Sequence, residues 1–280
     1  MAGLAAGLAA ESLAELAIDR RRSFKLIIAY DGLDFFGWQR QRVARTVQAT
    51  LEDAIKTITG ERVVHLLASS RTDTGVHALG QCATFRSLTW KAAAANLPLA
   101  INTQLPPDVV VRSAEEVPIQ FNPIRDACGK RYRYCIYASR INNPQGRRQA
   151  WWVKRPLNID AMRLAADRLL GQHDFASFQT AGSPRKSTVR TVKSIEIQSV
   201  DAMDGQAVTL EIEADGFLYN MVRSIVGTLV LPGLNRRPTE WVSEVLQSRD
   251  RKQAGPTAPP YGLCLMEVYF QSTDGTSPCA

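Results

Sequence analysis

The chain has 280 residues, of which 45% are hydrophobic and 22% charged, values typical of a soluble globular protein of one or two domains. Lys and Arg total 34 against 27 Asp and Glu, a net charge of +7. This excess favours an anionic partner, most simply nucleic acid. No run of 18 apolar residues occurs, which argues against a membrane span.

The cysteines and histidines argue against a metal site, because no CxxC pair occurs and only three histidines are available as further ligands. We expect free thiols in a cytoplasmic protein. Residues 1–22 lack a basic start and contain three acidic residues, so they predict an N-terminal extension and not a targeting segment. The five cysteines are Cys82, Cys128, Cys135, Cys264 and Cys279.

The first half of the chain alternates between strand and helix signals. Runs of β-branched and aromatic residues predict strands, and apolar residues at helical spacing predict helices. Gly60 is placed to end the first helix, and Pro98 to restart the second. The predicted order is strand 24–30, helix 47–58, strands 62–68 and 81–86, helix 90–103 and strand 109–117.

The second half repeats this order, with Asn158 placed to cap its first helix and Gly171 to end it. The β-α-β-β-α-β order is that of a ferredoxin-like unit, so we predict an α+β fold of two such halves flanking a central cleft. The expected parts are the extension 1–22, a first half 23–120, a second half 121–271 and a disordered tail 272–280. The second-half elements are strand 130–138, helix 158–171, strands 190–198 and 207–215, helices 217–231 and 239–248, and strand 262–270.

The segment SSRTDTGVHALG (69–80) contains Asp-Thr-Gly, the motif of aspartic proteases. Such a protease needs two carboxylates that share one proton, and only one such motif occurs here. Arg71, two residues from Asp73, should also keep that carboxylate ionised. The sequence therefore excludes the protease and leaves two readings. Asp73 is either an ionised nucleophile or base, or the polar residue of an ordinary turn.

Basic residues alternate with aromatic residues in KRYRYCIY (130–137), a pattern that suits base stacking and phosphate binding but also an ordinary strand. Four further basic clusters together suit a polyanion track. Arg223 lies inside an apolar helix, where a buried charge needs a partner, and Asp73 is the candidate. We expect His77 to hold its loop by hydrogen bonds. The four clusters are 20–25, 39–45, 146–155 and 183–190.

Six stretches, in order, resemble the bacterial tRNA pseudouridine synthases of the TruA type. They span nearly the whole chain, from about residue 24 to 270, and their order makes the resemblance specific. The resemblance implies an isomerase that converts uridine to pseudouridine at positions 38, 39 and 40 of the tRNA anticodon stem-loop. It also implies a homodimer that works without a metal or an organic cofactor. The stretches are 30–41, 70–81, 130–134, 173–178, 215–227 and 254–265.

The resemblance also implies roles for five residues. Asp73 matches the catalytic aspartate, and Arg223 the arginine that pairs with it. Tyr132 matches the tyrosine that stacks on the target uracil, and Leu263 the apolar residue on its other side. Arg71 matches the arginine implicated in extruding the base. The sequence does not decide whether Asp73 attacks the sugar or removes a proton.

Three places depart from the family pattern, and one of them, Pro260-Tyr261 before Gly262, differs only slightly. Ser70 replaces a usual glycine before Arg71, and Ile124 stands where an arginine is common, with Arg125 one step later. None removes a proposed catalytic group. A catalytically inactive protein that binds or remodels tRNA is the alternative, although binding alone does not need the Asp73 carboxylate.

Overall fold

The structure is a computed structural model that describes residues 21–180, 187–202 and 204–271. Most of the expected extension 1–22 and the whole tail 272–280 therefore lie outside the described residues. None of the described helices is long and apolar enough to cross a membrane.

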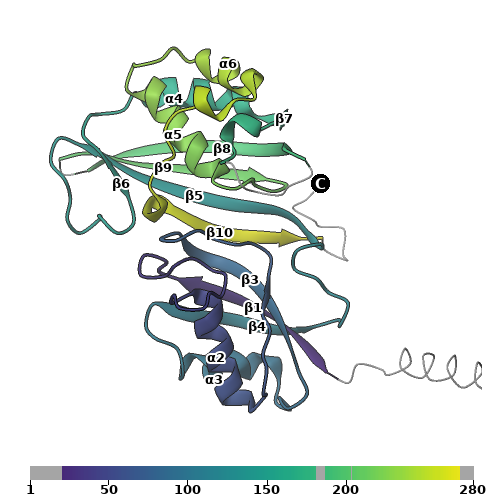
Figure 1. The fold of residues 1–280 in the computed structure, drawn as a ribbon. Helices are drawn as coiled ribbons and strands as arrows, with labels where there is room; N and C mark the ends of the chain where they lie inside the picture. Colours follow the sequence, from purple (N-terminus) through teal and green to yellow (C-terminus); the bar gives the residue numbers. More distant parts are fainter. Residues whose placement is uncertain (1–20, 181–186, 203, 272–280) are drawn as a thin grey trace, which may run out of the picture.

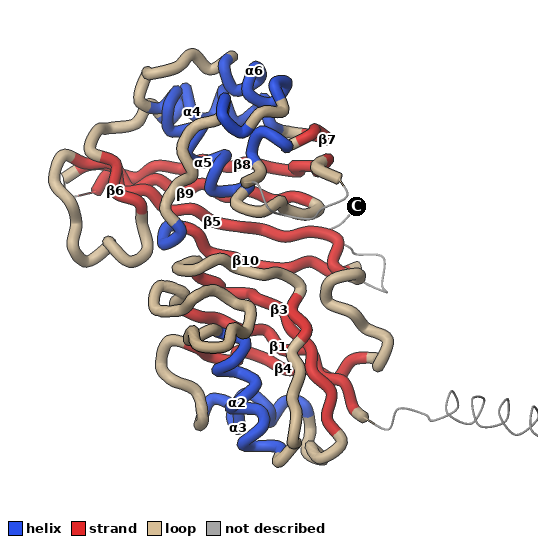
Figure 2. The backbone as a smooth tube through the Cα atoms, in the orientation of Figure 1, coloured by secondary structure: helices blue, strands red, loops and turns tan. Residues whose placement is uncertain are grey.

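The described strands form one ten-stranded sheet with helices grouped over each half (Figure 1, Figure 2). The main path runs β4-β1-β3-β10-β5-β9-β8-β7, with β2 on β3 and β6 on β5. The first-half strands are β1 (Arg22–Tyr30), β2 (Leu67–Ala68), β3 (His77–Ser87) and β4 (Val109–Val117). The others are β5 (Ala127–Ser139), β6 (Trp151–Val153), β7 (Gly171–Asp174), β8 (Val189–Ala202), β9 (Gly205–Ala214) and β10 (Leu263–Phe270).

Each half has the spatial strand order 4-1-3-2 of a ferredoxin-like unit, β4-β1-β3-β2 in the first and β10-β5-β9-β8 in the second. The expected α+β fold of two ferredoxin-like halves is confirmed. The halves join where β10 runs parallel to β3, with Cys264 opposite His77 and Leu265 opposite Ala78. The paired part of β3 begins at His77, two residues after the Asp-Thr-Gly tripeptide. This tripeptide therefore lies beside the second half of the chain.

The helices follow the predicted patterns with shifted ends. They are α2 (Val47–Thr59), α3 (Leu97–Asn102), α4 (Ile159–Ala166), α5 (Met221–Gly233) and α6 (Trp241–Ser248). Gly60 ends α2 and the Asn158 side chain caps α4, as predicted. Helix α5 begins at Met221 and not at residue 217, because Asn220 adopts a left-handed conformation with φ of 59°.

The strand predicted over 62–68 is wrong except for Leu67–Ala68. Val64 and Leu66 are buried, but their backbone is irregular. Side chains of α2, not a neighbouring strand, make hydrogen bonds with the Leu66 backbone. Glu52 accepts from the Leu66 N–H at 3.0 Å, and Gln48 donates to the Leu66 carbonyl at 3.2 Å. The short strands β6 and β7 were not predicted.

The expectation of free thiols holds for three cysteines and fails for one. Cys82, Cys135 and Cys264 are free, whereas Cys128 is disulfide-bonded. The spacing of the cysteines along the chain carried no signal for this bond, because no CxxC pair occurs.

Candidate active site

The Asp-Thr-Gly segment forms a loop, residues 69–76, between β2 and β3. Its centre is held by Thr72, whose carbonyl accepts from the Trp38 N–H at 3.0 Å and whose hydroxyl bonds the Tyr30 hydroxyl at 2.8 Å. Gly37, with φ of 80°, lies so close that a Cβ there would meet the Thr72 carbonyl oxygen at 2.8 Å. These contacts fix the loop against the rest of the first half.

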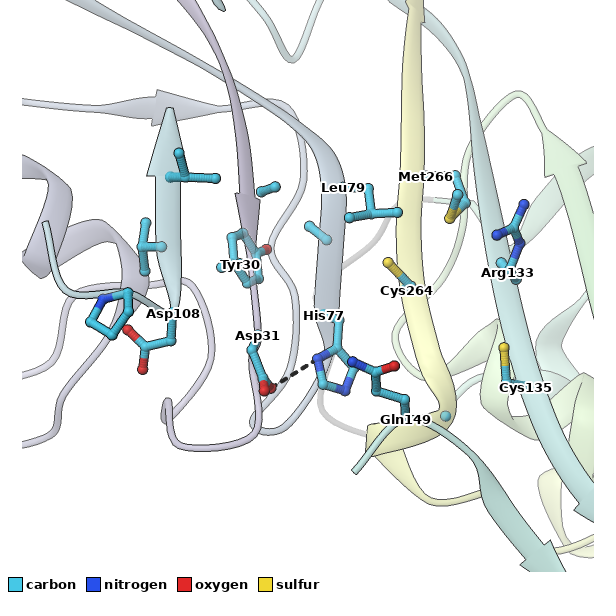
Figure 3. A pocket seen from close by; sticks show the side chains of 16 residues that line it. Tyr30, Asp31, His77, Leu79, Asp108, Arg133, Cys135, Gln149, Cys264 and Met266 are labelled. Atoms are coloured by element: carbon cyan, nitrogen blue, oxygen red, sulfur yellow. Dashed lines mark ion pairs between the residues drawn. The ribbon is translucent and has the colours of Figure 1, made fainter. Parts of the chain in front are cut away.

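His77 holds the end of the same loop, as predicted. Its Nδ1 accepts from the Gly32 N–H at 3.1 Å, and its Nε2 faces the carbonyl oxygens of Arg148 (3.0 Å) and Tyr261 (3.1 Å). Because a carbonyl oxygen can only accept, Nε2 carries a proton that it donates to these carbonyls. His77 thus ties the Asp-Thr-Gly loop to the second half of the chain, and Asp31 lies 3.1 Å from its Nδ1 (Figure 3).

Asp73 and Arg223 meet across the seam between the halves. The Asp73 Oδ2 lies 3.7 Å from the Arg223 Nη1, so the pair is electrostatic and too long for a good hydrogen bond. The Asp73 side chain is 30% exposed and the Arg223 side chain 15%. The structure therefore brings together the two residues that the sequence suggested as partners.

The electrostatics of Asp73 differ from the expectation. Burial raises the pKa of the Asp73 carboxyl above its ordinary value, and the Arg223 charge opposes this only in part. Arg71 is exposed and has no ion pair or hydrogen bond with another described residue. The expectation that Arg71 holds Asp73 ionised is therefore wrong, because Arg223 is the cation that acts on Asp73.

Arg223 is anchored by its own neighbours. Its Nε donates to the Ala258 carbonyl at 2.7 Å, its Nη1 donates to the Asn220 Oδ1 at 2.7 Å, and its carbonyl accepts from the Ala258 N–H at 3.1 Å. The segment that carries Ala258 lies directly on α5, because a Cβ at Gly227 would come within 1.7 Å of the Pro256 carbonyl oxygen. Only glycine allows this close approach.

Tyr132 lies on β5 beside the loop, with its side chain buried. Its ring packs edge to face against Phe217, with centroids 5.1 Å apart. Burial raises the pKa of Tyr132 to about 12, the Asp73 charge adds to this, and a side-chain hydrogen bond with Ser70 opposes it. Ser70, the first departure from the family pattern, is buried, and its carbonyl accepts a hydrogen bond from the Gln81 side chain at 2.9 Å.

Leu263 begins β10 and is buried. It lies opposite Tyr134 on β5, and its neighbour Leu265 lies opposite Tyr132. Because alternate residues of a strand share a face, Leu263 and Tyr132 are diagonal neighbours on one face of the sheet.

Ile124, which departs from the family pattern, belongs to the surface. Ile124 is exposed, and Arg125 pairs with Asp126 at 2.6 Å, which neutralises the shifted arginine.

Some cations of the basic clusters form ion pairs with acidic side chains, and others do not. Within 39–45 and 146–155, Arg40, Arg45 and Arg148 each form ion pairs with aspartate or glutamate. The exposed cations in these clusters without a carboxylate partner among the described residues are Arg42, Arg147, Lys154 and Arg155. With Arg71, these side chains are available to an external polyanion. Residues 183–186 of the fourth cluster lie outside the described residues.

A cavity of about 380 Å³ lies elsewhere, and Figure 3 shows its lining. Arg133 and Cys135 line it, and on β5 they point away from Tyr132 and Tyr134. The cavity is therefore on the opposite face of the sheet from Tyr132. We place the candidate site at Asp73, because an aromatic ring and a partly buried ion pair meet there.

The sequence missed three groups at this site: the edge of Phe217, the Ala258 carbonyl and the Asn220 amide. Phe217 and Asn220 lie in the 215–227 stretch, directly before α5, and that stretch alone gave no reason to single them out. Among the described residues, no cluster of three or more His, Cys, Asp or Glu side chains could hold a metal ion.

Comparison with known proteins identifies the family of the chain. A model of the tRNA pseudouridine synthase family matches residues 26–124 and 165–271. A tRNA pseudouridine synthase A of Thermoanaerobacter sp. (strain X514) is 45% identical over 249 residues, which cover 89% of this chain and 100% of that protein. Another, from Myxococcus xanthus, is 44% identical over 250 residues, 88% of this chain and 91% of that protein.

Among solved structures, a Cbf5-Nop10-Gar1 complex matches 88% of this chain and 59% of its own chain. The identity is 11% and the TM-score 0.33, too low a likeness to support a conclusion. The family model covers well over half of the chain, and the curated relatives match it over nearly their full length. The chain therefore belongs to the tRNA pseudouridine synthases of the bacterial TruA type, isomerases that act on tRNA.

Proposed function

We propose that this enzyme converts uridine to pseudouridine at positions 38, 39 and 40 of the tRNA anticodon stem-loop, with Asp73 as the essential catalytic residue. The observation that carries the assignment of Asp73 is its contact with Arg223 at 3.7 Å, beside the ring of Tyr132. A half-buried carboxylate opposite a cation is suited to react with a sugar or a base from which water is excluded.

The reaction breaks the glycosidic C–N bond, turns the base and joins its C5 to the sugar. Atoms are rearranged within one nucleotide, so no redox step is needed. The target base has to leave the stack first, at a cost of a few kcal/mol. We assign to Arg71 the task of filling the space that the base vacates, since its guanidinium is exposed two residues from Asp73. Tyr132 and Leu263 would then hold the uracil, Tyr132 by stacking.

The exposed cations without carboxylate partners support a contact with the phosphates of the tRNA backbone. We further propose that the enzyme acts in the cytoplasm as a homodimer, and that its halves divide near residue 120. The inactive tRNA-binding alternative gains no support, because Asp73, Arg223 and Tyr132 meet at one place.

The test is tritium release from tRNA that carries 5-tritiated uridine, comparing the wild type with Asp73→Asn. Substrates with a single uridine at position 38, 39 or 40 test the positions. Release by the wild type from each substrate, with retained tRNA binding and no release by the variant, is expected. Full activity of Asp73→Asn would overturn the role of Asp73. Binding without release by either protein would restore the inactive alternative.

A further inference from the structure

Asn220 is the first residue before α5, and its conformation is unusual. Its φ of 59° is in the left-handed region, which favours glycine and costs other residues energy. An asparagine before a helix normally caps it by accepting a hydrogen bond from a backbone N–H of the first turn. Asn158 does this for α4, where its Oδ1 accepts from the Ala161 N–H at 3.0 Å. Asn220 makes no such cap.

The Asn220 amide is used by two side chains instead. Its Oδ1 accepts from the Arg223 Nη1 at 2.7 Å, and its Nδ2 donates to the Thr180 Oγ1 at 3.1 Å. Because a guanidinium can only donate hydrogen bonds, the amide oxygen faces Arg223, and the amide nitrogen is left to donate to Thr180. A strained residue that gives up its helix cap to hold another side chain points to a role at the site.

We propose that Asn220 is a positioning residue that holds the Arg223 guanidinium back from Asp73, at ion-pair distance and without a direct hydrogen bond. The geometry supports this directly. The same Nη1 that donates to Asn220 at 2.7 Å is 3.7 Å from the Asp73 Oδ2, and the Nε is held by Ala258. A guanidinium free to move would close to the 2.7–2.9 Å of a charge-assisted hydrogen bond.

This distance matters for reactivity. A carboxylate that accepts a direct hydrogen bond from arginine is stabilised in its charged form and becomes a weaker base and nucleophile. At 3.7 Å, Arg223 supplies charge but no hydrogen bond, and burial remains the larger influence, so the pKa of Asp73 stays raised. The inference deepens the proposed function and depends on Asp73 being the catalytic carboxylate.

The other titratable groups around Asp73 are shared by every variant used in the test. Burial keeps the pKa of Tyr132 and of Cys264 at about 12, so both stay neutral in the acid range. The groups near the loop are Tyr30 on β1, His77 on β3, Lys130 and Tyr132 on β5, Cys264 on β10 and Arg223 on α5.

Two substitutions of Asn220 test the proposal because they act in opposite directions. Asn220→Gly suits the left-handed backbone, so the chain should fold, but it releases Arg223 towards Asp73. The acid limb of the single-turnover rate should move to lower pH, and the rate at neutral pH should fall by about tenfold or more. Asn220→Asp tolerates the same backbone and competes for the Arg223 charge, so the limb should move to higher pH.

Asn235→Gly is the matched control, because Asn235 also has a positive φ, of 54°, and follows the far end of α5. Its pH profile should match that of the wild type. Opposite shifts for the two Asn220 variants support the proposal. Equal or absent shifts overturn it, as does an upward shift for Asn220→Gly. If Asp73→Asn keeps its activity, the proposed function itself fails, which separates the two conclusions.

Discussion

The Asp73 carboxylate and the Arg223 guanidinium lie 3.7 Å apart although 150 positions separate them in the chain. One comes from a loop of the first half and the other from the first turn of α5 in the second half. Packing of the two halves along β3 and β10 brings these two residues together. A change that loosens this packing should therefore alter the distance between Asp73 and Arg223.

The Asp73 charge should cost stability. Because burial raises the pKa of Asp73, the folded chain binds this proton more tightly than the unfolded chain. The loss of stability caused by the Asp73 charge is fully present above the pKa of Asp73 in the folded chain, and it is absent below its pKa in the unfolded chain. Asp73→Asn should therefore melt at a higher temperature than the wild type at neutral pH, with the difference vanishing on acidification. Thermal unfolding at several pH values checks this, and a lower melting temperature at neutral pH would contradict it.

Removal of the Arg223 charge should move the pH profile. Arg223 is the cation that lowers the pKa of Asp73, so Arg223→Gln should raise that pKa further. If catalysis needs the ionised carboxylate, the acid limb of the single-turnover rate moves to higher pH. The measurement is the rate of tritium release against pH. Arg168→Gln, which breaks an exposed pair with Glu240 at 3.6 Å, serves as the control and should not move the limb.

Gly227 should tolerate no side chain. A Cβ there would sit 1.7 Å from the Pro256 carbonyl oxygen and push away the segment that anchors Arg223 through Ala258. We expect Gly227→Ala to lower the free energy of unfolding by about 2–4 kcal/mol and to reduce activity. Gly146→Ala is the matched control, since its Cβ meets nothing closer than 3.9 Å, and should change stability by less than about 0.5 kcal/mol. Urea unfolding measures both, and equal values would refute the close-packing argument.

Tyr132 should separate the roles of ring and hydroxyl. Tyr132→Phe keeps the ring and removes only the hydroxyl of a buried side chain, so the free energy of unfolding should change by about 1 kcal/mol or less while most activity remains. Tyr132→Leu removes the aromatic face, and the proposed stacking predicts a loss of rate of about tenfold or more. Single-turnover rates and urea unfolding give both numbers. A Leu variant as active as the Phe variant would exclude stacking.

Arg71 should contribute to tRNA binding as a free cation. Arg71→Gln should weaken binding and lower the slope of log affinity against log salt by about one unit, because a cation that enters the tRNA beside the target base also displaces a counterion from its backbone. Arg45 is the contrast, since Asp108 already pairs with it at 2.8 Å, and Arg45→Gln should leave the slope nearly unchanged. Filter binding over a range of salt concentrations distinguishes the two. Equal slopes for Arg71→Gln and the wild type would contradict the assignment.

The sequence by itself determined the parts whose signals are local. The helical spacing before Gly60, the Asn158 cap and the alternation of KRYRY each rest on neighbouring residues, and each of these elements is present. The end predicted for the Asn158 helix is wrong, because α4 ends at Ala166 and Gly171 begins β7. Repetition of the strand and helix order was enough to predict two ferredoxin-like halves. The candidate residues came from the order of six motifs, a linear property.

The tertiary structure alone decided what depends on contacts across the chain. The apolar segment 62–68 forms almost no strand, because side chains of α2 satisfy its backbone. Arg71 is near Asp73 in sequence yet does not pair with it, whereas Arg223 does. The burial that raises the pKa of Asp73 depends on how the halves pack, and no local pattern encodes it. The role proposed for Asn220 also depends on the tertiary structure. Its strained backbone can position Arg223 only because Asp73 lies beside that arginine.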